Sequence, residues 1–85
     1  MRLLETSKFQ KSRKKLKDEE EKAALKEAVL RVIEDPEAGK KLKGEFRDLR
    51  AFRFAVRGQA RRLIYKLEKD AVVLFSFGPR QGICK

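Results

Sequence analysis

The chain has 85 residues, of which 23 are Lys or Arg and 13 are Asp or Glu, and it carries a formal net charge of +10. One cysteine and no histidine exclude an intrachain disulfide framework and argue against a zinc site. No apolar run approaches the roughly 18 residues that a membrane span needs. The length predicts a single domain over residues 1–85, and the charge predicts an anionic partner, with nucleic acid as the first candidate.

The N-terminal half predicts a short strand followed by two helices. Residues 2–5 form the strand, and Thr6 or Ser7 can cap a first, mostly basic helix that runs to about Lys17. Asp18 is the expected N-cap of the second helix, whose first turn is acidic and so complements the helix dipole. Proline disfavours helical geometry in the residue before it, so this helix ends near Asp35. An apolar stripe at three- and four-residue spacing predicts that it packs on a sheet: Ala24, Leu25, Ala28, Val29, Val32 and Ile33.

After a basic linker over residues 37–44, apolar residues recur at every second position, the spacing of a strand with one buried face. Strands are predicted over residues 51–56, 62–67 and 71–77, with connections at 57–60 and at 69–70. Short connections between strands predict an antiparallel meander. The fold class is therefore α+β: strand, helix, helix and a three-stranded antiparallel meander, with both helices on one face of a curved sheet. Tyr65 alternates with Leu63 and Leu67 and is expected in the core. The other face is expected to be comparatively open and carries Arg53, Ala55, Arg62, Ile64 and Lys66.

The chain ends with Gly78-Pro79-Arg80-Gln81-Gly82-Ile83-Cys84-Lys85, directly after the last predicted strand. Glycine and proline followed by arginine at the end of a strand place a guanidinium group at the rim of the sheet. Arginine suits phosphate because its planar fork donates two parallel hydrogen bonds. An open sheet face with convergent arginines is therefore a candidate site for an anion.

The order of these elements resembles the RelE/ParE superfamily of toxins from type II toxin–antitoxin systems, and the likeness covers nearly the whole chain. The segments that carry it are Leu42-Lys43-Gly44, Phe52 to Val56, Arg62-Leu63-Ile64-Tyr65 and Gly78-Pro79-Arg80 with Cys84-Lys85. Within the superfamily, the chain looks closest to the RelE branch. The resemblance implies a ribosome-dependent mRNA endoribonuclease in which a ribose 2′-OH attacks the adjacent phosphate, with no metal or other cofactor. It also implies a cytoplasmic protein whose partners are the ribosome, mRNA and a cognate acidic antitoxin of the RelB type, with no membrane.

The resemblance assigns catalytic roles to Arg53, Arg62, Arg80 and Cys84. The arginines stabilise the negative charge that develops on the phosphoryl oxygens. Contacts to RNA or the ribosome are expected from further basic residues: Lys11, Lys14, Lys15, Lys43, Arg57, Arg61 and Lys66.

Two positions depart from the RelE pattern, since Ala55 and Cys84 stand where a lysine and a tyrosine are usual. Arginine is a poor general base because it does not lose its proton. The thiol can transfer a proton but cannot stack on a base. Two alternatives therefore stay open: a non-catalytic inhibitor of DNA gyrase of the ParE type, and a catalytically weakened protein that only binds RNA or the ribosome.

Overall fold

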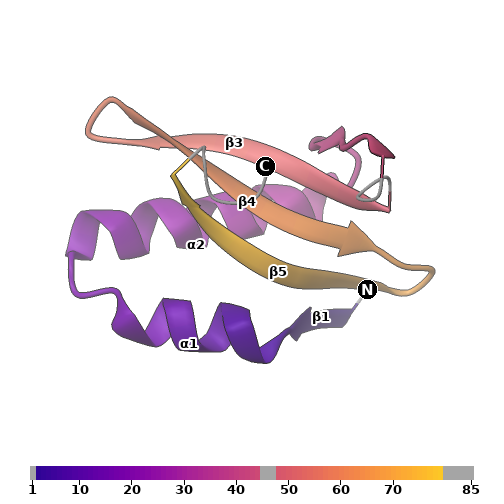
Figure 1. Cartoon of the computed structure of the whole chain (residues 1–85), viewed down its shortest axis with the longest axis horizontal. Coiled ribbons are helices and arrows are strands. Elements are labelled where there is room, and N and C mark those ends of the chain that lie inside the picture. Colours follow the sequence, from indigo (N-terminus) through magenta and orange to yellow (C-terminus); the bar gives the residue numbers. More distant parts are fainter. Residues whose placement is uncertain (1, 45–47, 80–85) are drawn as a thin grey trace.

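The computed structural model describes residues 2–44 and 48–79, which form two helices and a five-stranded sheet (Figure 1). The elements are β1 (Arg2–Glu5), α1 (Ser7–Lys15), α2 (Glu19–Glu34), β2 (Lys40–Lys41), β3 (Leu49–Val56), β4 (Gln59–Leu67) and β5 (Ala71–Pro79). The strands lie in the order β1-β5-β4-β3-β2, with β1 parallel to β5 and the other pairs antiparallel. The α+β class and the antiparallel meander are confirmed. No helix of the described chain is long and apolar enough to cross a membrane.

Both helices begin at the expected caps. The Thr6 side chain accepts a hydrogen bond from the backbone N–H of Phe9 at 3.1 Å, and Asp18 accepts one from that of Glu20 at 3.1 Å. The first helix ends at Lys15, two residues earlier than predicted, because Leu16 adopts an extended conformation (φ −68°, ψ 126°). The second helix ends at Glu34, close to the predicted boundary before Pro36.

The β3–β4 hairpin has a tighter turn than the sequence indicated. Arg57 and Gly58 alone connect the strands, and both have positive φ (51° and 80°), as a two-residue type I′ turn requires. Strand β4 therefore begins at Gln59 and pairs Ala60 with Ala55. The predicted linker also contains a strand that the sequence analysis missed, β2, in which Lys40 pairs with Ala51.

The core lies between the helices and the sheet. Helix α1 packs on β5, and α2 packs on β3 and β4. Tyr65 is fully buried, as predicted; its hydroxyl donates to the carbonyl of Pro36 at 2.6 Å and accepts from the N–H of Gly39 at 3.0 Å. The core cluster consists of the buried side chains of Phe9, Leu25, Ala28, Val32, Leu63, Tyr65, Val72 and Leu74.

The sheet face away from the helices is not open along its whole length, which corrects the expectation for Ile64. This side chain is 2 % exposed. It lies in the central strand between Ala51 of β3 and Ser76 of β5, both of which are also buried. Exposed side chains on this face lie instead towards the end of β3 that leads into the hairpin, where Arg53 and Ala55 are exposed.

Candidate anion-binding site

Arg53 and Arg62 form the centre of the candidate site because β3 and β4 place them directly opposite each other. Side chains of directly opposed residues in an antiparallel pair share one face of the sheet, with their Cβ atoms about 5 Å apart. Arg53 is exposed and Arg62 is half-buried. Two of the three arginines that the resemblance assigned to catalysis are therefore neighbours on the face that lies away from the helices.

The two opposed cations offer an anion hydrogen-bond donors from both strands. A phosphate held between two guanidinium groups accepts charge-assisted hydrogen bonds from each of them. On the β5 side, Gly78 is the cross-strand partner of Arg62 and adds no side chain next to it. Among the described residues, its two chain neighbours aside, no heavy atom lies within 4 Å of a Cβ atom added to Gly78. The geometry therefore suits the binding of a phosphate group.

Ala55 leaves one position of this face without a charge. It is exposed, lies two residues beyond Arg53 on the same strand and is paired with Ala60. At about 3.3 Å per residue, its Cβ lies roughly 7 Å from that of Arg53 on the same face. A lysine here would reach the space above the arginine pair, and the methyl group of alanine supplies neither charge nor proton.

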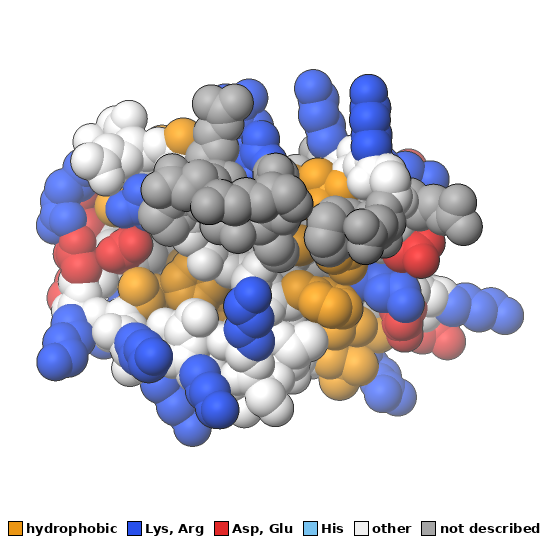
Figure 2. All heavy atoms as spheres, in the orientation of Figure 1, with side chains coloured by type: hydrophobic (Ala, Val, Ile, Leu, Met, Phe, Trp, Pro, Cys, Tyr) orange, Lys and Arg blue, Asp and Glu red, His pale blue; other side chains and the backbone are white. Residues whose placement is uncertain are grey.

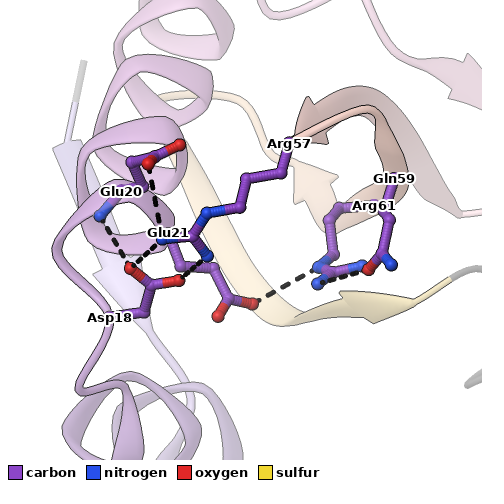
Figure 3. Close-up of polar contacts among 6 residues, drawn as sticks. All are labelled: Asp18, Glu20, Glu21, Arg57, Gln59 and Arg61. Carbon is purple, nitrogen blue, oxygen red and sulfur yellow. Dashed lines mark hydrogen bonds and ion pairs between the residues drawn. The ribbon is translucent and has the colours of Figure 1, made fainter.

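Arg57 and Arg61, for which contacts to RNA or the ribosome are predicted, are ion-paired with the start of α2 (Figure 3). Arg57 donates hydrogen bonds to both carboxylate oxygens of Asp18, and its Nη2 lies 3.3 Å from Glu20 Oε1. Arg61 Nε lies 3.3 Å from Glu21 Oε2. The hydrogen bonds from Arg57 lower the pKa of Asp18, and the same contact raises the pKa of Arg57. These two arginines connect the hairpin to α2 and have part of their donors occupied.

Lys66 and Lys43 lie towards the other end of the sheet from the arginine pair. Lys66 follows Arg62 by four residues on β4, about 13 Å along the strand, and its Nζ lies 3.2 Å from Glu68 Oε2. Lys43 is exposed and follows Leu42, whose N–H donates to the carbonyl of Leu49 at the start of β3 at 3.0 Å. Neither lysine is placed to replace the missing charge at position 55.

The basic residues of α1 belong to the helical layer of the molecule, and Lys11, Lys14 and Lys15 are exposed there. Blue Lys and Arg side chains also stand at many places on the side of the molecule seen in Figure 2, where red acidic side chains are fewer. Basic charge is therefore spread over the surface. Arg80 and Cys84, the remaining predicted catalytic residues, lie outside the described residues.

Arg31 is a further basic residue near the site that the sequence analysis missed. A hollow of about 370 Å³ lies between α2 and β3 and is lined by Arg31 and Glu27 of the helix and by Phe52 to Ala55 of the strand. Arg31 Nη2 lies 3.4 Å from Glu27 Oε1. Its position one helical turn after the apolar residue Ala28 gave no functional signal, because only the packing of α2 on β3 brings it towards Arg53. Within residues 2–44 and 48–79, no cluster of acidic or cysteine side chains could hold a metal ion.

The chain matches a protein-family model and is similar to several solved structures. Residues 3–84 match the model for the ParE-like toxin of type II bacterial toxin–antitoxin systems. The toxin in the E. coli RelBE toxin–antitoxin complex is 26% identical, with a TM-score of 0.74 over 94% of this chain and 96% of that chain. The isolated E. coli RelE toxin gives the same identity and TM-score over 94% and 84%. A conserved hypothetical protein from Helicobacter pylori, 19% identical over 92% of both chains with a TM-score of 0.56, shares the fold. No curated protein sequence matches.

Proposed function

Since this chain belongs to the ParE-like toxins of type II bacterial toxin–antitoxin systems, we propose that it inhibits translation as a ribosome-dependent mRNA endoribonuclease of the RelE type. The similarity to E. coli RelE over 94% of the chain supports this branch of the family. The observation that carries the proposal is the direct opposition of Arg53 and Arg62 on one face of the sheet. The site of action is the cytoplasm, where ribosomes and mRNA meet the toxin.

In the proposed reaction, the 2′-oxygen of a ribose attacks the adjacent phosphorus and loses its proton. The bond from phosphorus to the 5′-oxygen of the next nucleotide breaks, and that oxygen takes up a proton. The products are a 2′,3′-cyclic phosphate and a 5′-hydroxyl end. Arg53 and Arg62 hold the phosphate and stabilise the charge on its oxygens in the transition state. They do not serve as the base, because a guanidinium group keeps its proton.

The proposed partner that silences the toxin is an antitoxin encoded with it. The E. coli relative was solved as a complex of toxin and antitoxin, and a chain with a net charge of +10 attracts an acidic partner. Co-expression with a small acidic protein encoded next to the toxin should give a stable complex and relieve toxicity. Failure of the two proteins to co-purify would remove this part of the proposal.

The decisive experiment is to induce the chain in a bacterial host and map mRNA 5′ ends. We expect growth arrest with new 5′ ends at preferred codon positions, and loss of both in the variants Arg53→Ala and Arg62→Ala. Arg80→Ala tests the third predicted arginine. Lys69→Ala is the matched control, since it removes an exposed cation of the connection between β4 and β5, at the end of these strands away from the arginine pair. Intact mRNA in growth-arrested cells would refute the nuclease activity.

A second candidate function is inhibition of DNA gyrase without catalysis. The matching family model describes ParE-like toxins, and the absence of a basic side chain at Ala55 favours a protein that does not cleave RNA. This function predicts double-strand DNA breaks and an SOS response with intact mRNA. A weakened homologue that only binds ribosomes would instead be non-toxic and would sediment with ribosomes at low salt, since phosphate contacts weaken as salt rises.

A further inference from the structure

Lys40 is a further basic residue on the sheet face that carries the arginine pair. Strand β2 pairs Lys40 with Ala51 of β3, and directly opposed residues of an antiparallel pair share one face. Ala51 and Arg53 share that face as well, because they lie two residues apart on β3. Lys40 therefore lies on the same face as Arg53 and Arg62, although it falls in the stretch for which the sequence predicted a linker.

Within this face, Lys40 is a diagonal neighbour of Arg53. The Cβ atoms of such neighbours are about 7–8 Å apart, a separation that long side chains span. Arg62 lies on the other side of Arg53, directly opposite it on β4. The three cations thus follow one another across the adjacent strands β4, β3 and β2. Lys40 and Ala55 lie on opposite sides of Arg53 along the strand direction, so Lys40 extends the site and does not fill position 55.

Two hydrogen bonds fix the backbone directly before Lys40. The N–H of Gly39 donates to the Tyr65 hydroxyl at 3.0 Å, and the Gly39 carbonyl accepts from Arg50 Nη1 at 2.9 Å. Gly39 and Tyr65 are both buried. A two-residue strand at the edge of the sheet therefore has a firmly held backbone, and a side chain that starts from a fixed point loses less freedom when it binds a ligand.

The ammonium group of Lys40 is accessible to a ligand. The residue is exposed, and no carboxylate in the part of the chain that the structure describes forms an ion pair with it. Lys66 lies on the same face but is held by Glu68, whose Oε2 is 3.2 Å from its Nζ. Of these two lysines, Lys40 is thus the one whose charge is not already offset by a neighbouring side chain.

This arrangement fits a ligand with more than one phosphate. Lysine binds phosphate as a compact point charge with three donors, whereas an arginine pair holds it with planar forks. The separation of Lys40 from Arg53 is comparable with the spacing of successive phosphates along a single RNA strand. A phosphate held by Arg53 and Arg62 would therefore bring the phosphate of a neighbouring nucleotide within reach of Lys40.

We propose that Lys40 forms a second phosphate subsite beside the arginine pair and binds the phosphate of the nucleotide next to the one held by Arg53 and Arg62. The inference rests on the proposed function in taking RNA as the ligand. Lys40 does not touch the reacting atoms in this arrangement. It strengthens binding and sets the path of the strand, which crosses the sheet from β4 over β3 to β2.

The test measures binding of short single-stranded RNA to the full-length protein by NMR titration. The ligands carry 2′-O-methyl groups, which block the attacking oxygen and so prevent cleavage. One ligand is a dinucleotide with a single phosphate, and the other is a trinucleotide with two. We expect Lys40→Ala to weaken trinucleotide binding at low salt by at least about fivefold, and to alter dinucleotide binding by less than about twofold.

Lys41→Ala is the matched control. Lys41 is the next residue of β2, is exposed, and pairs with Arg50 on the other face of the sheet. Its removal takes away the same charge and should alter either affinity by less than about twofold. Lys40→Arg keeps the charge and should retain trinucleotide binding. In Lys40→Ala, the slope of log affinity against log salt for the trinucleotide should fall by about 0.7, the loss of one phosphate contact. Circular dichroism confirms that each variant is folded.

Several results would overturn the subsite. Equal weakening by Lys40→Ala and Lys41→Ala would show a general effect of net charge. Equal loss for both ligands would place Lys40 on the first phosphate. Binding of a glutamate-rich peptide that depends on Lys40, with RNA binding unchanged in Lys40→Ala, would assign the lysine to an acidic protein partner.

Failure of the subsite and failure of the proposed function have different signatures. Trinucleotide binding that Arg62→Ala weakens and Lys40→Ala does not would remove the subsite and leave the function standing. Intact mRNA in the induction experiment would refute the nuclease activity, and the binding data alone would then decide on the subsite. Absence of trinucleotide binding by the parent protein would overturn both the subsite and the RNA-binding part of the function.

Discussion

Removal of the Tyr65 hydroxyl is expected to destabilise the fold by about 2–3 kcal/mol. The hydroxyl accepts from the N–H of Gly39 at 3.0 Å and donates to the carbonyl of Pro36 at 2.6 Å. In Tyr65→Phe both backbone groups lose this partner. Gly39 is buried, so its N–H is left unsatisfied at about 1–3 kcal/mol, whereas the half-exposed Pro36 carbonyl can bind water at a smaller cost.

Urea unfolding followed by circular dichroism measures this loss. With a slope of about 1 kcal/mol per molar urea for a domain of this size, the midpoint should fall by roughly 2–3 M. The variant Gly39→Ala tests the same contact from the other side, because the added Cβ would lie 2.6 Å from the hydroxyl oxygen. A loss below about 0.5 kcal/mol in Tyr65→Phe would refute the reasoning, since it would mean that the two backbone groups find other partners.

Three further outcomes follow from the charges and the site. Burial raises the pKa of Tyr65 above its ordinary value of 10.0, so the stability that its neutral form provides is complete below pH 10 and falls as pH rises through the folded-state pKa. Alkaline unfolding should therefore be shallower in Tyr65→Phe than in the parent, and identical pH profiles would contradict the burial. Arg57→Ala should lower the urea midpoint at low salt, and the difference should shrink at about 1 M NaCl, because the ion pair with Asp18 is solvent-exposed; a difference that does not depend on salt would point to packing instead. Ala55→Lys should raise the rate of mRNA cleavage by at least about tenfold, since it adds a cation roughly 7 Å from Arg53; an unchanged rate would show that another group already fills this role.

The sequence predicted the starts of both helices correctly, because a single capping residue determines where a helix begins. Thr6 and Asp18 cap the two helices because a side-chain oxygen satisfies a free N–H of the first turn. The apolar stripe of α2 faces the sheet, and Tyr65 lies in the core. The strand alternation also placed Arg53 and Arg62 on one face, which is the part of the candidate site that the structure describes.

The tertiary structure decided what depends on segments far apart in the chain. The I′ turn and the packing of α2 on β3 bring Arg57 and Arg61 to Asp18 and Glu21, and these ion pairs could not be read from the sequence. Likewise, β1 pairs with β5 and the two-residue β2 pairs with β3, pairings that no local pattern specifies. The sequence by itself determined the helix caps, the spacing of apolar residues in the helix and strands, and the excess of positive charge, because these depend only on composition and on residues close in the chain. Which cations pair with carboxylates, and which face each other across two strands, depends on backbone register, and that exists only in the folded chain.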